Sequence, residues 1–263
     1  MCPVQEKKLL IIRPRVVNPP DYWTMYTYDA SEHFASDAQK NGWTVVKELD
    51  ENLANRAEVE YIIQSEKPNL VIHYGHGWTD RLWGQNNNQK ESVLSCALGE
   101  ENVKLLSSTS TSTVSCWSAL DLGKRAVEEN KSRQKTYFLG YDIPIYCDYD
   151  RRYYFNYWRA ANAANDALIA GRTFQDAWKI GYDKYTEEYN KLLALRDPYV
   201  KLWIAPLLLS NRDHFKLWES TRGPTLAARV PMFGNSIIVQ RYLRKIRDKI
   251  FSKKAHERLH PLV

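Results

Sequence analysis

Two short segments of the chain carry the residue types that covalent catalysis needs. The first has the sequence HYGHG at 73–77 and follows an apolar run, and the second has the sequence SCWS at 115–118. An imidazole that takes a proton and a thiol that becomes a thiolate can together attack a carbonyl carbon. We therefore take His76 and Cys116 as the candidate catalytic pair.

Two other uses of residues 73–77 fail for physical reasons. The side chains of a strand alternate between its faces, so His73 and His76, three positions apart, point to opposite sides and cannot share a metal ion. Gly75 and Gly77 lack the third glycine and the following helix of the dinucleotide-binding fingerprint. The remaining alternative is a tight turn in which His73 is buried and His76 is exposed.

The position of Cys116 favours a reactive thiol. It follows a predicted strand and precedes a predicted helix, and a helix N-terminus stabilises a thiolate. If the strands that end at 74 and 116 are neighbours, they lie about 4.8 Å apart, which brings His76 within a few ångströms of Cys116. The alternative is that Cys116 is a small buried hydrophobic residue, as most free cysteines are.

Other catalytic or metal sites find little support in the sequence. The remaining cysteines are Cys2, Cys96 and Cys147. With no C-x-x-C pair, neither a disulfide framework nor a zinc site is expected. The sequence has no G-x-S-x-G elbow and no H-E-x-x-H motif, which argues against a serine hydrolase and a zinc protease. We expect neither a metal nor another cofactor.

A sheet must position the two segments, and the first 145 residues alternate strand-like and helix-like patterns. This alternation predicts an α/β fold, a three-layer sandwich with a mainly parallel sheet. The predicted strands are at 8–12, 43–49, 70–74, 113–116 and 136–141. Helices are predicted between them, one capped by Asp29 or Ser31 and ending at Asn41-Gly42, and one capped by Asp50.

The second half is predicted to be mainly helical. Helices are expected over 153–170 and from a cap at Thr173 to 192, followed by one or two late strands at 203–209 and 215–218. Residues 78–102 are polar and are predicted to be an irregular loop. Residues 107–115 are nearly all Ser and Thr, so the strand before Cys116 is either short or partly solvated.

Size and charge limit the classes of protein. A chain of 263 residues and 30.8 kDa, with 44% hydrophobic and 26% charged residues, is expected to form one folded domain. Residues 237–263 hold eight Lys or Arg and two acids, which leaves 29 of each sign in the rest. The pI near 9.0 therefore describes a basic tail. This distribution argues against a nucleic-acid surface over the main body.

The chain shows neither a membrane-spanning stretch nor a signal peptide. Its longest apolar runs are far shorter than the ~18 residues that a spanning helix needs. The first residues lack the basic head and apolar middle of a secretory signal. We therefore expect a soluble, cytoplasmic protein. The segment 236–263 is predicted to be a basic amphipathic helix that packs on the domain, or binds an acidic partner, RNA or a membrane surface.

With these residues in place, the chain resembles the caspase-like cysteine peptidases of clan CD. The sequence YGHG at 74–77 is most similar to gingipain and CHAT-type domains, and DHFKLW at 213–218 is similar to the closing strand of gingipain-like domains. The resemblance implies a caspase-hemoglobinase-like domain over 1–235. It also implies that His76 is the general base, that Cys116 is the nucleophile, and that no third residue is required.

The same resemblance implies further parts of a peptidase site. The backbone N–H groups of Gly77 and Cys116 would form the oxyanion hole. Asp142, after the fifth strand, would line the substrate pocket and favour Arg or Lys before the cut. Alternatively, Asp142 begins the turn before Pro144. Protein substrates are the expected partners, together with a regulatory protein.

The sequence therefore predicts a regulated cysteine endopeptidase with a Cys–His dyad. Two alternatives stay open. One is a non-catalytic interaction module on the same fold. The other is a doubly wound domain that binds a small molecule, in which residues 74–77 only form a ligand turn.

Overall fold

The computed structural model describes residues 6–17, 21–85, 94–130, 135–147 and 151–220. Its strands are β1 (Lys8–Arg13), β2 (Thr44–Asp50), β3 (Leu70–Tyr74), β4 (Gly77–Trp78), β5 (Arg81–Gln85), β6 (Leu94–Gly99), β7 (Ser110–Val114), β8 (Tyr137–Tyr141) and β9 (Phe215–Glu219). Its helices are α1 (Tyr22–Ser31), α2 (Phe34–Lys40), α3 (Arg56–Glu66), α4 (Asp121–Glu128), α5 (Arg151–Ile169), α6 (Phe174–Ala194) and α7 (Ala205–Asp213), with short helical turns at Glu51–Leu53, Val103–Ser108 and Val200–Ile204.

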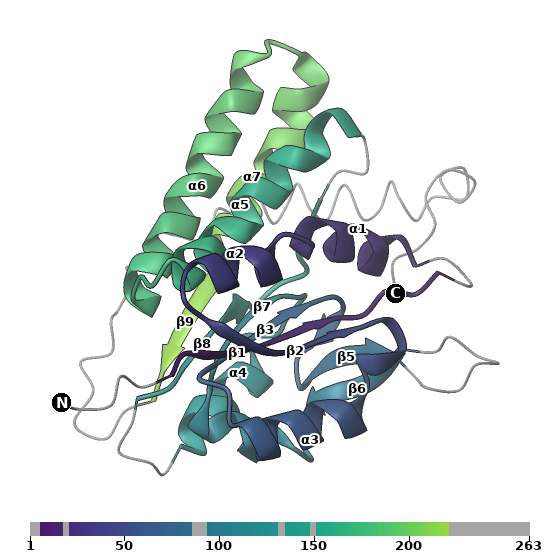
Figure 1. Ribbon diagram of the computed structural model, residues 1–263. Coiled ribbons are helices and arrows are strands. Elements are labelled where there is room, and N and C mark those ends of the chain that lie inside the picture. The colour runs from purple at the N-terminus through teal and green to yellow at the C-terminus, as the bar shows by residue number, and fades with distance from the viewer. Residues whose placement is uncertain (1–5, 18–20, 86–93, 131–134, 148–150, 221–263) are drawn as a thin grey trace. The chain divides into compact units, whose positions relative to one another are not determined.

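A six-stranded sheet runs through the centre in the order β2-β1-β3-β7-β8-β9 (Figure 1). All neighbouring strands are parallel except β8 and β9, which are antiparallel. Helices cover both faces, so the predicted α/β class with a mainly parallel sheet is confirmed. The order of the first five strands is that of a doubly wound sheet, whose switch point lies between β1 and β3.

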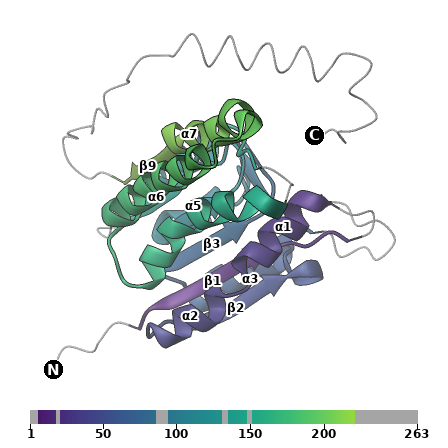
Figure 2. The same cartoon turned by 90° about the horizontal axis from the view of Figure 1, so that it is seen from above.

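Alternate residues of the central strands feed two separate cores. Leu9 and Ile11 of β1 pack beneath α1, α2, α5, α6 and α7. Leu10 and Ile12 pack on the other face, toward α3, α4 and the second sheet. Figure 2 looks down on the first helical layer, where α1, α2, α5 and α6 pass over the strands. Burial on both faces explains why these strands are continuous in apolar character.

The prediction of an irregular loop over 78–102 was wrong. β4, β5 and β6 form a small antiparallel sheet on the α3 side of the molecule. Leu82, Ala97 and Leu98 of this sheet are fully buried. Their signal in the sequence is weak because each strand is short. Residues 86–93, at the tip between β5 and β6, lie outside the described residues.

Neither reading of the hydroxyl-rich strand was correct. β7 is a full central strand, and its Thr111, Ser112 and Thr113 are buried. Side chains satisfy most of the hydroxyls: Ser112 Oγ bonds the Asn165 amide of α5, and Thr113 Oγ1 donates to Ser115 Oγ at 2.7 Å. Sheet position and tertiary partners, rather than hydrophobicity, make this strand possible.

Some helices and their caps also differ from the predictions. Residues 203–209 are helical and do not form the predicted strand. Pro206 does not prevent this, since it lies at the start of α7, where proline is tolerated. A helix that the sequence did not predict, α1, begins after Asp21, and neither Asp29 nor Ser31 caps α2. The side-chain cap of α3 is Asn55, not Asp50.

Other local signals are confirmed. Asn41-Gly42 ends α2, with Gly42 at φ +79°, and Thr173 Oγ1 accepts the Asp176 N–H at the start of α6. The described residues belong to a compact unit, Met1–Arg222. The predicted boundary at 235 and the basic helix lie outside the described residues.

Candidate active site

β3 and β7 are hydrogen-bonded neighbours, which is the arrangement that a Cys–His pair requires. Tyr74 lies opposite Val114 in the register, and the Gly75 N–H donates to the Val114 carbonyl at 3.4 Å. His76 and Cys116 each follow two residues beyond this last pair. Both residues therefore follow the carboxyl ends of adjacent strands, and sites in α/β proteins form at this edge of the sheet.

Gly77 packs directly on the backbone that carries Cys116. A Cβ atom at position 77 would lie 2.5 Å from the Cys116 carbonyl oxygen and 2.9 Å from Ser115 Cβ. Both distances are shorter than van der Waals contact allows, so only glycine fits. The two candidate segments thus touch through their main chains.

The hairpin of β4 and β5 sets the direction of the Gly77 amide. The Trp83 N–H donates to the His76 carbonyl at 3.0 Å, and Gly77 lies opposite Leu82. Hydrogen-bonded and non-hydrogen-bonded pairs alternate in an antiparallel ladder, so the Gly77 N–H points away from β5. The Gly77 N–H therefore makes no hydrogen bond to β5. Its role in an oxyanion hole, with the Cys116 N–H, stays a prediction.

His76 is held by an aspartate that the sequence analysis missed. His76 Nε2 lies 2.8 Å from Asp21 Oδ2, and the two side chains are 23% and 18% exposed. The other carboxylate oxygen caps α1 by accepting the N–H groups of Trp23 and Thr24 at 3.0 and 3.2 Å. Asp21 follows β1 and His76 follows β3, so the pair spans the switch point of the sheet.

The charge of Asp21 is stabilised in this position. Burial by itself raises the pKa of the Asp21 carboxyl, but the hydrogen bond and charge of His76 and the N–H groups at the start of α1 outweigh it, and the pKa lies below its ordinary value. A carboxylate accepts only, so the proton of the neutral His76 ring is on Nε2. Its Nδ1 atom is then left as the basic nitrogen.

The Cys116 thiol is not in the state that the sequence predicted. α4 begins at Asp121, five residues after Cys116, so Cys116 does not lie at the N-terminus of this helix. Cys116 Sγ accepts the Ile145 N–H at 3.3 Å. Burial raises the thiol pKa to about 11, and this N–H offsets only part of the effect. Within the described ranges, no hydrogen bond joins Cys116 Sγ to His76.

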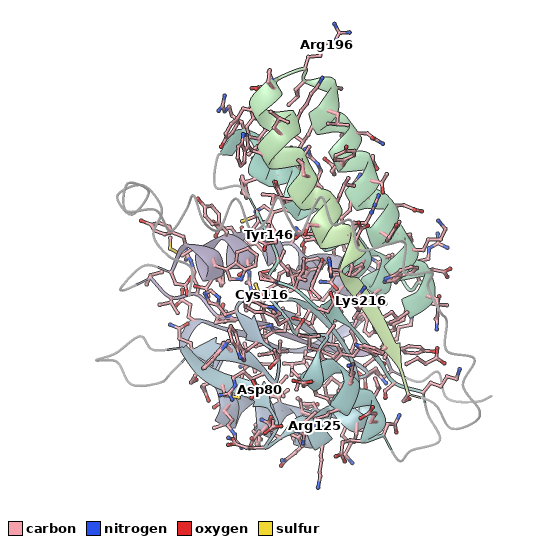
Figure 3. The ribbon with its side chains drawn as sticks, turned by 180° about the vertical axis from the view of Figure 1, so that it is seen from behind. Asp80, Cys116, Arg125, Tyr146, Arg196 and Lys216 are labelled. Carbon is pink, nitrogen blue, oxygen red and sulfur yellow. The ribbon has the colours of Figure 1, made fainter. Side chains whose placement is uncertain are left out.

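Residues 142–147, which we call the strap, lie against Cys116. The Ile145 N–H donates to the sulfur, and the Trp117 N–H donates to the Ile143 carbonyl at 3.0 Å. The buried Asn211 of α7 clamps the strap, because its amide accepts the Tyr146 N–H at 3.0 Å and donates to the Tyr146 carbonyl at 2.7 Å. Figure 3 labels Tyr146 and Cys116 near each other.

The residue after Cys116 has a strained backbone. Trp117 has φ +52°, which costs a bulky side chain about 1–3 kcal/mol. Its ring packs edge-on against Trp78, with 4.6 Å between ring centroids. This left-handed backbone conformation lies in the turn between β7 and α4. Such outliers concentrate at functional sites.

Asp142 lies at the end of β8 and faces the last strand. Its carboxylate is 2.6 Å from His214 Nδ1 and 3.6 Å from Lys216 Nζ, and its N–H donates to the His214 carbonyl at 3.1 Å. These contacts already engage the carboxylate that was expected to attract Arg or Lys. Asp148 and Asp150, two further carboxylates after the same strand, lie outside the described residues.

His73 is fully buried, as the turn interpretation of residues 73–77 expected, and burial lowers its pKa to about 4. In the described part of the chain, no group of three or more His, Cys, Asp or Glu residues is arranged to hold a metal ion. No described helix is long and apolar enough to cross a membrane.

Asp21 could have been found from the sequence. It stands after Pro19-Pro20 and before an aromatic, threonine-rich stretch, which is a helix start signal. Its contact with His76 requires the sheet order and had no signal in the sequence.

The chain was compared with known proteins. No family model and no curated protein matches the sequence. Among solved structures, the Arg-specific cysteine proteinase gingipain R (RGPB) is similar, with a TM-score of 0.42, 13% sequence identity and 69% of this chain covered. The chain spans 43% of that gingipain chain. This distant match is to a cysteine proteinase and does not establish an activity.

Proposed function

We propose that this protein is a cysteine endopeptidase of the caspase-like type that is held here in a closed, resting arrangement. The observation that carries the proposal is the contact of Gly77 with the Cys116 backbone, which brings the His76 and Cys116 segments together at the ends of β3 and β7, beside the switch point of the sheet. The hydrogen bond between His76 and Asp21 also supports the proposal, because it fixes the orientation of the His76 imidazole ring.

The proposed reaction uses the residues of this chain in two steps. His76 Nδ1 takes the Cys116 proton, the thiolate attacks the peptide carbonyl, and the C–N bond breaks as the amine leaves with that proton. Water then hydrolyses the thioester and restores the thiol. The N–H groups of Gly77 and Cys116 would stabilise the oxyanion of each tetrahedral intermediate. The Asp21 carboxylate would stabilise the imidazolium.

The strap must move before this reaction can occur. The Cys116 sulfur has to exchange the Ile145 N–H for the imidazole of His76, and its surroundings have to lower the thiol pKa from about 11. A substrate with Arg or Lys before the cut stays part of the proposal. Its cation would compete with His214 and Lys216 for Asp142.

A non-catalytic interaction module is the second candidate. The raised pKa of the Cys116 thiol favours it, as does the hydrogen bond from Ile145 in place of one from His76. This candidate predicts a folded protein that binds a partner and cuts nothing.

Labelling with peptide acyloxymethyl ketones separates the two candidates. The thiolate displaces the acyloxy group and forms a thioether, so an adduct at Cys116, found by peptide mapping, reports a nucleophilic site. We expect this adduct with Arg or Lys beside the reactive group, and no cleavage activity in Cys116→Ala. Cys96→Ala is the matched control that keeps labelling and activity. Cleavage by folded Cys116→Ala, or a folded wild type that is neither labelled nor active, would reject the endopeptidase.

A further inference from the structure

A buried histidine that the proposed reaction does not use connects the two catalytic segments. His73 lies on β3, with no exposed surface. Its Nδ1 atom is 2.8 Å from Ser115 Oγ, and its Nε2 atom is 2.8 Å from the Trp83 carbonyl oxygen. Three elements, β3, β5 and the end of β7, are therefore tied to one ring.

The partners determine the protonation of this ring. A carbonyl oxygen can only accept a hydrogen bond. Nε2 of His73 therefore carries the ring proton and donates the hydrogen bond to the Trp83 carbonyl oxygen. Nδ1 then accepts from the Ser115 hydroxyl, and Ser115 Oγ accepts from Thr113 Oγ1 at 2.7 Å. The hydrogen bonds run in one direction, from Thr113 through Ser115 and His73 to Trp83. A neutral imidazole supplies both the donor and the acceptor that this chain needs.

Two members of this chain of hydrogen bonds, Ser115 and Trp83, adjoin the candidate site. Ser115 directly precedes Cys116, and its Cβ lies 2.9 Å from the place that a Cβ at position 77 would take. Trp83 uses its carbonyl for His73 and its N–H for the carbonyl of His76, at 3.0 Å. The His73 ring thus connects the backbone of the base to the backbone of the nucleophile.

We propose that His73 is a positioning residue that holds the His76–Gly77 backbone against the Cys116 backbone through Trp83 and Ser115. This inference rests on the proposed function. Displacing a reacting group by about 1 Å can cost on the order of 100-fold in rate. A brace of this kind should therefore affect kcat more than KM.

Two variants remove the brace at different points. His73→Phe keeps a flat ring and removes both hydrogen bonds of His73. Ser115→Ala keeps the bond to Trp83 and removes the link to Cys116, together with the bond that Ser115 Oγ accepts from Thr113 Oγ1. His73→Gln keeps a neutral donor and an acceptor and is the conservative variant. Thr111→Val is the matched control, because Thr111 Oγ1 is a buried β7 hydroxyl that has no hydrogen-bond partner.

Peptide cleavage and hydrogen exchange are measured for each variant, with the urea midpoint as the measure of global stability. We expect His73→Phe and Ser115→Ala to lower kcat about tenfold or more with KM changed less than about threefold. Exchange of the backbone at 75–77 and 115–117 should rise about tenfold, with β1 unchanged. Thr111→Val should match the wild type, and His73→Gln should recover most of kcat.

The outcomes distinguish a wrong brace from a wrong function. If the wild type has no Cys116-dependent cleavage, the proposed function fails, and hydrogen exchange of the two segments still decides whether His73 holds them together. If folded His73→Phe and Ser115→Ala both retain wild-type exchange at 75–77 and 115–117, the inference is overturned. If His73→Phe does not fold, Ser115→Ala decides alone.

Discussion

Asp21 has a separate task for each of its two carboxylate oxygens. One oxygen caps α1 and the other holds the His76 ring. An Asp-to-Asn change separates these tasks, because asparagine caps a helix as well as aspartate does. The orientation of the His76 ring, in contrast, depends on the negative charge of Asp21 and on a carboxylate oxygen that can only accept a hydrogen bond.

Asp21→Asn should lower kcat by about 100-fold or more while α1 and the urea midpoint stay nearly unchanged. The side-chain amide that faces Nε2 would donate, which moves the imidazole proton to Nδ1 and removes the base; the corresponding change in the serine protease triad costs about 10⁴-fold. Peptide hydrolysis at pH 7 is the measurement. Asp29→Asn, an exposed change in the same helix, is the control. Wild-type kcat in Asp21→Asn would show that the contact with His76 has no catalytic role.

Stability should depend on pH through His73. Its pKa in the folded protein is about 4, below the ordinary 6.5, because burial disfavours the charged ring. The unfolded chain therefore binds more protons between these values. The stabilisation by the neutral ring is complete above pH 6.5 and is lost as pH falls toward 4, a loss of about 3 kcal/mol.

Urea unfolding at pH 7 and pH 4 tests this expectation. Carboxylates also titrate in this interval, so the comparison is between wild type and His73→Gln, which has no titrating group at this position. The variant should lose about 3 kcal/mol less than the wild type on acidification. Equal losses in the two proteins would mean that His73 does not contribute to the pH dependence.

At the scale of elements, α7 holds the strap and the strap contacts Cys116. The Asn211 amide bonds both the N–H and the carbonyl of Tyr146, as a neighbouring strand would. The strap in turn places the Ile145 N–H on the sulfur. We therefore expect the reactivity of the thiol to depend on Asn211, a side chain of a helix far along the chain.

Asn211→Leu should release the strap and increase alkylation of Cys116 by iodoacetamide at pH 8 about tenfold or more. Each unit by which the thiol pKa falls from about 11 raises the thiolate fraction tenfold at this pH. Asn102→Leu is the matched control, because Asn102 clamps Gly99 N–H and the Ala97 carbonyl in the same way within β6. Peptide mapping identifies the alkylated cysteine. Unchanged Cys116 alkylation in folded Asn211→Leu would exclude the strap as the restraint.

At the scale of the whole molecule, the sheet places the site at its switch point. β1 and β3 are neighbours, but the chain leaves their ends in different directions, toward α1 and toward the small second sheet (Figure 1). Asp21 and His76 meet between these two exits. On the other side of β3, β7 supplies Cys116. Three strand ends therefore contribute to one site.

A buried polar layer between the sheet and α5 supports this arrangement. Tyr74 OH donates to Asn162 Oδ1 at 2.9 Å and accepts from the Asn165 amide at 2.7 Å. The amide of Asn165 also meets Ser112 of β7. Buried hydrogen bonds of this kind require one register, because a shifted helix would leave them unsatisfied. They fix α5 over β3 and β7, the two strands that carry the site.

Local signals in the sequence determined much of the fold. Apolar runs located β1, β2, β3 and β8 within one or two residues, and Thr173 located the start of α6. These features depend on neighbours in the sequence, so a pattern is enough to find them. The same patterns indicated that the candidate residues, His76 and Cys116, lie at strand ends, which the register of β3 and β7 confirms.

Only the tertiary structure decided what surrounds those two residues. β7 is a central strand in spite of its hydroxyl groups because Asn165 and Ser115 satisfy them. The contacts of His76 with Asp21, of His73 with Ser115 and of Cys116 with Ile145 join residues that are 29 to 55 positions apart. The sequence carries no local trace of such pairs, because strand order and register bring them together. The pKa of Cys116 likewise depends on its burial and on the Ile145 N–H, 29 positions away, which the sequence does not encode locally.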